Sequence, residues 1–478
     1  MILNPYSSLD WNAVIPLFIV AGTALLVLFA DLLTRGGAKR YVSVSLSIIG
    51  LATAGVFCGD IYLQSYSAFG GGFIVGRFAV IFQELVILSA LFSVALYAAI
   101  GEEDRLAGSL ALMLWGASGA MLMAGAGNLM TIFLGLELLS LALYCLCGMS
   151  KRPAARESAL KYLILSSTAS GFLLYGMALF FGATGSISLA ALAQPGVMTN
   201  PLFVAGTGLF LVGLAFKLSL VPFHAWAPDV FEGAPLPITA FMSVATKAGT
   251  LAVFARFSYA ALTAPHAHQL LVPIWVIAAI SMLFGNFAAL AQTDMKRLLA
   301  YSGIAQVGYI MVAFAGTTVL GLRYAIFYLA AYLFMNLGAF GVVALLSTEN
   351  EEGSNIAAFH GLGRRRPLLA AAMTFFLLAL AGFPPTAGFI GKILILSSAV
   401  SAGYAWLAGV LIAGTAVSLY VYFKIIRLMY ERTEHKHVVE VRSNAPLAWI
   451  SVGICVIATI ALTFYPIAPS GNVLPLVK

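Results

Sequence analysis

The sequence predicts an all-α polytopic membrane protein with about fourteen transmembrane helices. Of its 478 residues, 62% are hydrophobic and only 9% are charged, whereas a soluble domain carries about 25% charged residues. The apolar residues form runs of about 20, the length that a helix needs to cross a bilayer. Runs of this length are expected to be helical, because lipid offers the backbone no hydrogen bonds. No polar linker separates them, so residues 1–478 are predicted to form one membrane domain.

The expected spans follow one another with short connections. Their approximate limits are 11–34, 40–63, 74–100, 106–126, 128–150, 157–183, 200–234, 236–262, 270–292, 297–319, 322–347, 367–402, 403–430 and 446–468. The N-terminal stretch MILNPYSSLDW has no basic residue. A cleaved signal peptide is therefore not expected, and the first span should remain in the membrane.

Basic residues mark alternate connections between these spans. They are Arg35, Lys39, Arg40, Lys151, Arg152, Arg156, Lys296, Arg297, Arg364, Arg365, Arg366, Arg432, Lys436 and Arg442. The connections between the basic ones (60–72, 185–199 and 263–269) contain no lysine or arginine. Lysine and arginine collect in cytoplasmic loops, so both termini are predicted to lie on the outer side of the membrane.

Two of the spans contain prolines that should break the helix. Span 200–234 carries Pro222 and Pro228, and span 367–402 reads LALAGFPPTAGFIGKILIL around its centre. Proline removes a backbone donor and clashes with the preceding turn. Broken helices in two halves of a chain are typical of transporters built from repeats. The breaks are five spans apart, an odd number, so the two repeats are expected to be inverted.

Four charged residues stand inside predicted spans. They are Glu137, Lys217, Lys247 and Lys392. A charge at mid-bilayer costs about 2.5–3.5 kcal/mol on insertion scales, so it normally faces protein or water. The spans that carry Lys217 and Lys247 form a hairpin, which places the two lysines at similar depth. Lys392 should lie nearer the outer side.

This set of charges suits proton transfer. Burial favours the neutral form of a lysine, whereas a nearby carboxylate favours the charged form. A Glu137–Lys217 pair would hold the lysine charged, and its separation would release the proton. Lys247 and His224 could pass the proton on, and Lys392 could deliver it to the outer face. The structural alternative is that the charges only form ion pairs and that His224 only caps the broken helix.

Other polar residues leave alternatives open. Tyr301, Ser302, Gln306 and Tyr309 give span 297–319 a polar side, which could line a water path or only bond between helices. Glu157 and Lys161 are four residues apart, as in a surface ion pair. Asp229 and Glu232 are expected in a cytoplasmic turn. Glu84 lies inside span 74–100, and its role is open.

Several function classes are excluded by missing motifs. The sequence has no Walker A motif for ATP and no G-x-G-x-x-G after a strand for NADH. Its four cysteines form no C-x-x-C pair and no Cys/His cluster, so no metal centre or cofactor is expected in this chain. The net charge of +7 is too sparse for nucleic acid. The driving energy must come from a partner or an ion gradient.

Four stretches between residues 210 and 395 resemble a known family. They are FKLSLVPFHAWAPDVFEGAPLPITAF, KAGTLAVFARF, QTDMKRLLAYSGIAQVGYI and LAGFPPTAGFIGK. They resemble the antiporter-like membrane subunits of respiratory complex I, and most closely the subunit N family of bacterial NADH–quinone oxidoreductase.

The resemblance implies an architecture and a set of roles. A three-helix segment (1–105) would precede two inverted five-helix repeats (106–262 and 270–430) and a C-terminal helix (446–478). Glu137 matches the family's glutamate and Lys217 its lysine partner, while Lys247 matches the central lysine and Lys392 the exit-side lysine.

The resemblance also implies partners and a location. The partners would be antiporter-like subunit M and the small K-, J- and A-type subunits, in the bacterial inner membrane. FMN, iron–sulfur clusters and quinone would be held by other subunits. Three alternatives stay open: an Mrp-type cation/proton antiporter subunit, a structural scaffold subunit, and a subunit of a ferredoxin-linked oxidoreductase or membrane hydrogenase.

Overall fold

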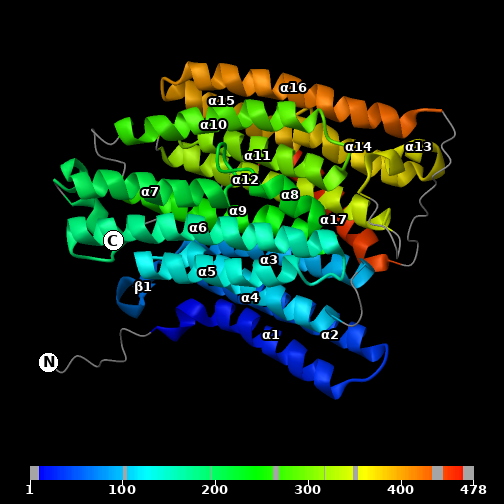
Figure 1. Ribbon diagram of the computed structural model, residues 1–478, viewed down its shortest axis with the longest axis horizontal. Coiled ribbons are helices and arrows are strands. Elements are labelled where there is room, and N and C mark those ends of the chain that lie inside the picture. Colours follow the sequence, from blue (N-terminus) through cyan, green and yellow to red (C-terminus); the bar gives the residue numbers. More distant parts are fainter. Residues whose placement is uncertain are drawn as a thin grey trace.

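The protein is a bundle of long helices that lie side by side (Figure 1). A computed structural model describes residues 10–100, 105–194, 196–261, 268–316, 318–347, 354–432 and 445–466. Within these ranges, eleven helices are long and apolar enough to cross a membrane. The all-α polytopic membrane fold is therefore confirmed. The count of fourteen spans, the domain limits and the inverted repeats remain predictions.

The helices follow the predicted spans closely. In chain order they are α1 (Ile15–Leu33), α2 (Ala38–Ile61), α3 (Arg77–Ile100), α4 (Leu106–Gly125), α5 (Leu129–Cys147), α6 (Pro153–Thr184), α7 (Pro201–Lys217), α8 (Trp226–Gly233), α9 (Leu236–Ala261), α10 (His268–Ala289), α11 (Met295–Val312), α12 (Val319–Leu345), α13 (Leu362–Arg365), α14 (Pro367–Ala381), α15 (Ala387–Ser401), α16 (Ala405–Tyr430) and α17 (Pro446–Phe464).

One short hairpin interrupts the helical pattern between α2 and α3. Strands β1 (Tyr66–Ala68) and β2 (Phe73–Val75) pair antiparallel. The turn between them uses Gly70 and Gly71, whose φ angles of 61° and 88° are left-handed. Glycine adopts such angles without the steric cost that a Cβ brings.

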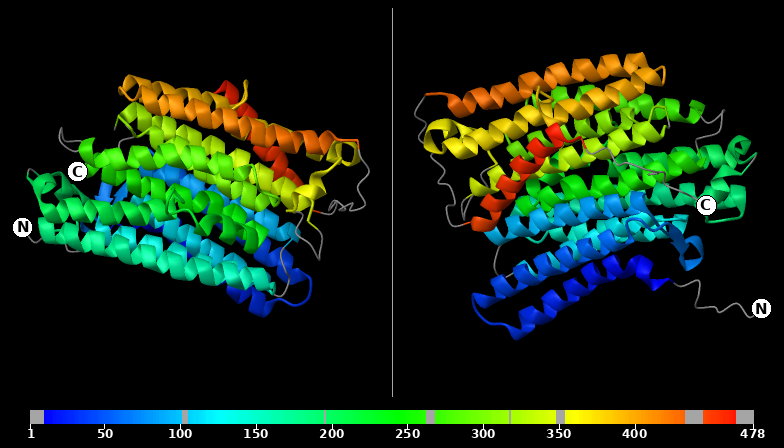
Figure 2. Two further views of the ribbon diagram at one scale, coloured as in Figure 1. Left: turned by 45° about the horizontal axis from the view of Figure 1, so that its top comes forward. Right: turned by 180° about the vertical axis from the view of Figure 1, so that it is seen from behind.

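The centre of the bundle is formed by α3, α9 and α12, which pack on one another. Residues 236–258 of α9 are all buried, so Lys247 and the serine and threonine side chains of this helix lie inside the protein. α17 crosses the other helices obliquely in the rear view (Figure 2) and packs mainly on α12 and α3.

The first predicted broken helix is confirmed by the gap between α7 and α8. α7 ends at Lys217, and α8 begins at Trp226. Ser219 has a φ of 58°, which a regular helix does not allow. The Val221 amide donates to Ser281 Oγ of α10 at 2.9 Å, so a side chain replaces the lost helical partner.

The second break separates α14 from α15. α14 ends at Ala381, and Gly382 follows with a left-handed φ of 79°. This is the usual C-terminal stop of a helix. The Thr386 side chain then caps α15 by accepting a hydrogen bond from the Phe389 amide. Pro222, Pro384 and Pro385 therefore lie in the two breaks as predicted, whereas Pro228 lies in the first turn of α8 and breaks no helix.

Candidate functional site

Lys217 is buried at the last residue of α7, between α5 and α6. Its side chain is 3% exposed, and its Nζ donates to Ser140 Oγ and Ser166 Oγ at 2.6 Å each. The rings of Tyr144 and Tyr162 lie 5.8 and 5.5 Å from the ammonium. A cation at a helix C-terminus is favoured by the helix dipole. The break therefore leaves a charged group inside the bundle with hydroxyl partners.

Glu137 lies one helical turn before Ser140 on α5. Residues three apart share a face of a helix, so the carboxylate lies on the same side of α5 as the serine that binds Lys217. Its Oε1 is buried and has no hydrogen-bond partner in the described part of the chain. The structure thus shows Lys217 bound to serines, not paired with Glu137.

Lys247 lies in the middle of α9 and is 3% exposed. In the described ranges, no protein acceptor lies within hydrogen-bond distance of its Nζ; its neighbours are the rings of Phe231 at 5.5 Å and Tyr332 at 6.0 Å. The Tyr332 hydroxyl is buried and likewise lacks a partner among these residues. Buried polar groups of this kind are usually satisfied by water. The surroundings of Lys247 are therefore suited to a bound water.

Gly303 of α11 keeps the space beside Lys247 free. A Cβ at this position would lie 3.0 Å from the Tyr332 hydroxyl and 3.6 Å from Lys247 Nζ. One turn away, Asn336 Nδ2 donates to Ser243 Oγ at 2.6 Å and ties α12 to α9. The surroundings of Lys247 are thus built from α9, α11 and α12, with Phe231 of α8 beside them.

The polar side of α11 continues from this point. Ser302 Oγ lies 2.5 Å from the Tyr422 hydroxyl of α16. Gln306 donates to the Leu380 carbonyl at 3.0 Å and accepts from Tyr328. Tyr309, the third member, bonds to Asn286 of α10 at 2.8 Å, while Tyr301 lies nearer the surface against Phe284. Three of the four residues singled out in the sequence therefore lie inside the bundle as bonded groups.

Lys392 binds the end of α14 across the second break. Its Nζ donates to the carbonyls of Ala381 at 2.8 Å and Leu380 at 3.3 Å, and the Tyr309 ring lies 4.4 Å away. The side chain is 4% exposed. The Leu380 carbonyl also accepts from Gln306, so one backbone oxygen joins the lysine to the polar side of α11. Both breaks therefore place a lysine at the C-terminal end of a half-helix.

Gly382 is needed for this contact, so we expect Gly382→Ala to weaken it. An added Cβ would lie 2.8 Å from Lys392 Cδ, and a left-handed φ costs an alanine about 1–2 kcal/mol. Gly403→Ala is the matched control, because Gly403 has a φ of 85° with open space around it. The unfolding temperature should fall in both variants and further in Gly382→Ala, whereas activity should fall only in Gly382→Ala. Equal activities would show that the position of Lys392 is unimportant.

His224 lies between α7 and α8 and is partly exposed. Its ring packs against Phe284 of α10 with a centroid separation of 4.6 Å. Its Nδ1 is buried without a partner, and no described contact joins it to the four buried charges. The structure therefore does not bring His224 together with the lysines.

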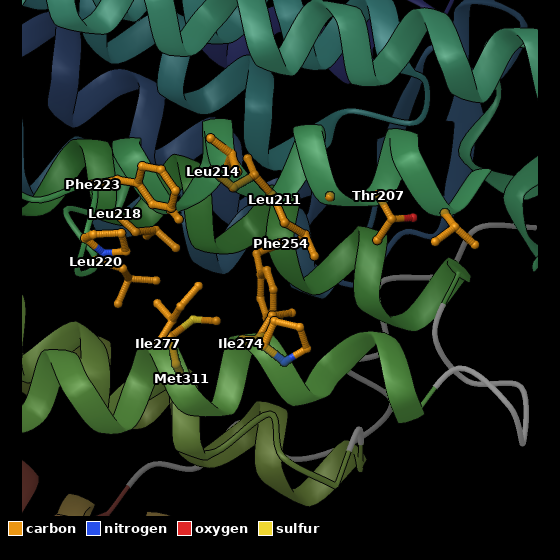
Figure 3. A pocket seen from close by; sticks show the side chains of 16 residues that line it. Thr207, Leu211, Leu214, Leu218, Leu220, Phe223, Phe254, Ile274, Ile277 and Met311 are labelled. Carbon is orange, nitrogen blue, oxygen red and sulfur yellow. The ribbon is translucent and has the colours of Figure 1, made fainter. Parts of the chain in front are cut away.

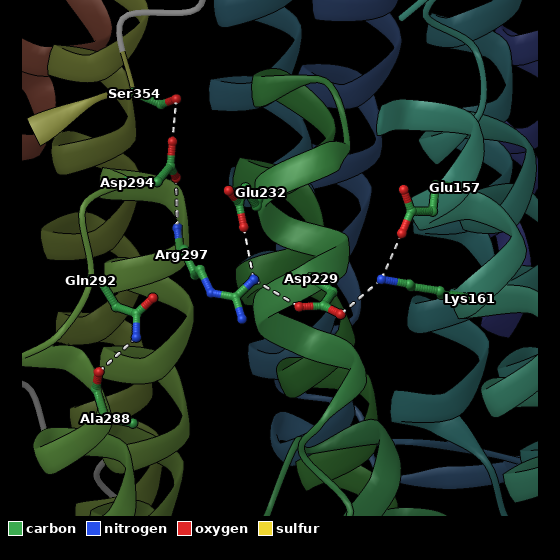
Figure 4. A network of polar contacts seen from close by, with 9 residues as sticks. All are labelled: Glu157, Lys161, Asp229, Glu232, Ala288, Gln292, Asp294, Arg297 and Ser354. Carbon is green, nitrogen blue, oxygen red and sulfur yellow. Dashed lines mark hydrogen bonds and ion pairs between the residues drawn. The ribbon is translucent and has the colours of Figure 1, made fainter. Parts of the chain in front are cut away.

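A network of ion pairs joins helices α6, α8 and α11 (Figure 4). Lys161 of α6 binds Glu157 at 2.8 Å and Asp229 of α8 at 3.1 Å. Arg297 of α11 binds Asp229 at 2.7 Å and Glu232 at 2.8 Å. Glu157 and Lys161 are thus more than an isolated pair. Asp229 and Glu232 stand in helix α8, not in a turn.

We expect Asp229→Asn to lower stability modestly. Asp229 holds both cations of the network, but exposed ion pairs contribute about 0–1 kcal/mol each. Glu232→Gln is the control, because Glu232 pairs with Arg297 alone among the residues that the structure describes. When the protein is heated in detergent, the fraction that stays assembled should decrease slightly more for Asp229→Asn than for Glu232→Gln. The activity of both variants should stay within about twofold of the parent. A complete loss of activity would instead place the network in the functional route.

Comparison with known proteins decides the family. The model described as NADH:quinone oxidoreductase/Mrp antiporter, TM, matches residues 126–418. NADH-quinone oxidoreductase subunit N 1 of Symbiobacterium thermophilum is 42% identical over 439 residues, which cover 89% of each chain. The chain belongs to the subunit N family.

Solved structures agree with this assignment. A chain of respiratory complex I from Thermus thermophilus with bound aureothin is 33% identical, with a TM-score of 0.82. The match covers 97% of this chain and 99% of that chain. A chain of the Mrp complex from Dietzia sp. has a TM-score of 0.79 at 21% identity, covering 94% and 95% of the two chains, and shows a shared fold alone.

One buried charge of this subunit N family member was missed in the sequence. Arg256 of α9 is 1% exposed and donates twice to the Ala124 carbonyl at the end of α4, at 2.9 and 3.1 Å. Its guanidinium lies 4.9 Å from the Phe78 ring. A cation at a helix C-terminus stabilises the exposed carbonyls, so Arg256 joins α4 to α9. The signal was a charged residue six positions before the end of the predicted span 236–262.

Two further observations complete the site. Glu84 of α3 is partly buried, and a Cβ added at Gly55 of α2 would lie 3.5 Å from its Oε2. It lies near α2, and no role follows from this placement. In the described ranges, no three His, Cys, Asp or Glu side chains gather as metal ligands.

Proposed function

We propose that this chain is the proton-translocating membrane subunit N of a bacterial NADH–quinone oxidoreductase, respiratory complex I. The observation that carries the proposal is the placement of three lysines, each at most 4% exposed, among buried hydroxyl, phenol and amide groups. Two of them, Lys217 and Lys392, donate hydrogen bonds at the helix breaks. The 42% identity to a subunit N supports the same assignment.

In the proposed route, Glu137 and Lys217 form the switch. When the carboxylate approaches, it favours the charged lysine; when Lys217 rests on Ser140 and Ser166, the charge is no longer compensated and the proton can leave. Water beside Lys247 receives the proton. No redox centre is needed in this chain, because it transfers protons alone.

The second half of the route leads to Lys392. Ser302, Gln306 and Tyr309 of α11 offer oxygen and nitrogen atoms between Lys247 and the second break. Lys392 exchanges its hydrogen bonds to the α14 carbonyls for contact with water on the outer side. The lysine can do this because its pKa responds to burial, whereas an arginine would stay charged.

We also propose a membrane and a set of neighbouring subunits for the chain. It would lie in the bacterial inner membrane with both termini on the outer side, and it would contact subunit M and the small K-, J- and A-type subunits. FMN, iron–sulfur clusters and quinone would belong to other subunits of the complex. The alternate basic connections of the sequence support this orientation.

Inside-out membrane vesicles test the proposal. NADH-driven quinone reduction should drive proton uptake, and a strain lacking this chain should lose that uptake. The purified chain alone should not exchange Na⁺ for H⁺ in liposomes. Exchange by the isolated chain would favour an Mrp-type antiporter, and pumping that is intact without the chain would contradict the proposal.

A further inference from the structure

A cavity of about 410 Å³ lies between α7 and α10, beside the first helix break. Figure 3 shows Leu211 and Leu214 of α7 and Ile274 and Ile277 of α10 pointing into it. α7 packs mainly on α6, and α10 packs on α11 and α16. The two helices therefore leave a space between them, which reaches inward to Phe254 of α9, a side chain only 1% exposed.

The walls of this cavity offer water almost nothing to bind. Its lining side chains are apolar except for Thr207, whose hydroxyl already donates to the Phe203 carbonyl at 2.9 Å. A buried water needs two to four polar partners, so a cavity with apolar walls stays dry. An occupant of this cavity must therefore be a hydrocarbon.

The cavity opens between two apolar helix faces. Val204 on α7 and Val272 and Val276 on α10 are exposed beside it. An unbranched chain can enter from the lipid side. The volume is also within the range of roughly 300–1,000 Å³ that is typical of ligand cavities.

We propose that this cavity binds one acyl chain of a membrane phospholipid. The chain would pack against Leu218 and Leu220, which follow Lys217 in the non-helical segment. At this point the backbone has left the helix, so a hydrocarbon on its lipid side keeps water away from the segment. The site would thus seal the break from the membrane side, while Lys217 faces the serines on the other side.

A photoreactive lipid tests the proposal in the assembled complex. Phosphatidylethanolamine with a diazirine near the end of one acyl chain would be incorporated into membranes, activated, and mapped by peptide mass spectrometry. Labelling is expected on peptides that contain Phe254 or Met311, which form the inner wall. Absence of this label in the parent complex would overturn the proposal without any variant.

Gly208→Phe tests whether the acyl chain occupies the cavity, because the new ring would compete for the same space. A Cβ at Gly208 meets no atom within 4 Å, so the ring should occupy the cavity without disturbing α7. Labelling should fall about tenfold, equivalent to about 1.4 kcal/mol of binding. Gly171→Phe on α6 is the matched control, because Gly171 also has open space but lies outside the cavity. Gly208→Leu serves in its place if the larger ring prevents assembly.

The other occupants give different results. If a side chain of a neighbouring subunit fills the cavity, the lipid label is absent and Gly208→Phe disrupts assembly. If an isoprenoid quinone tail fills it, a photoreactive quinone labels the inner wall and the phospholipid does not. Either result, or equal labelling in Gly208→Phe and Gly171→Phe, would overturn the proposal. None of these readouts depends on proton transfer, so the proposed function is tested separately.

Discussion

Replacing Lys247 by methionine is expected to stop proton transfer while leaving the assembled complex intact. Lys247 has no protein hydrogen-bond partner in the described ranges, so its burial is not compensated by a contact that the variant would lose. Replacement of a buried charge by an apolar side chain of similar volume is often neutral or stabilising. A positioned proton carrier contributes typically about 10²–10⁴ in rate, so we expect proton uptake to fall at least tenfold.

Two separate measurements distinguish a proton-carrying role of Lys247 from a purely structural one. Assembled complex would be quantified on a native gel, and NADH-driven proton uptake would be expressed per assembled complex. A scaffold role predicts the reverse pattern, with less assembly and unchanged uptake per complex. Asn336→Leu is a useful companion variant, because it removes the bond to Ser243 one turn away and leaves Lys247 in place.

Lys392→Met is expected to reduce both stability and proton transfer. Its ammonium donates to two carbonyls at the end of α14, and hydrogen bonds to a charged group contribute about 1.5–3 kcal/mol. Lys392→Arg should restore much of the stability, because the guanidinium can donate to the same carbonyls. It should not restore proton transfer, because arginine does not release its proton at physiological pH.

Thermal unfolding and proton uptake would be measured on all three forms. A thermal midpoint restored by arginine together with absent uptake would identify Lys392 as a proton carrier. If arginine restores both, Lys392 acts only by holding the second break together.

The sequence predicted the membrane fold and both broken helices because these depend on local chemistry. Apolar runs of sufficient length must be helical in lipid, and Pro222, Pro384 and Pro385 interrupt the helix wherever the neighbours lie. The buried charges Lys217, Lys247 and Lys392 were visible for the same reason, since a charge in an apolar run is costly.

The side chains that these charges contact could not be predicted from the sequence. Ser140 and Ser166 bind Lys217 only because α5, α6 and α7 meet at that point, and a serine in an apolar helix carries no signal of this. Arg256 capping α4 depends equally on packing between helices far apart in the chain. The network through Asp229 was interpreted as a local pair and a turn, because its long-range partner Arg297 lies 68 residues away.

The most direct test of the account is the combined measurement on Lys217→Ala and Glu137→Gln. NADH-driven quinone reduction and proton uptake would be recorded together on membranes in which assembled complex has been quantified. If the two residues carry the proton, both activities should fall at least about tenfold in a complex that still assembles. Full activity in both variants would show that these charges are structural, and the proton route would then have to be sought along α11 or at Glu84.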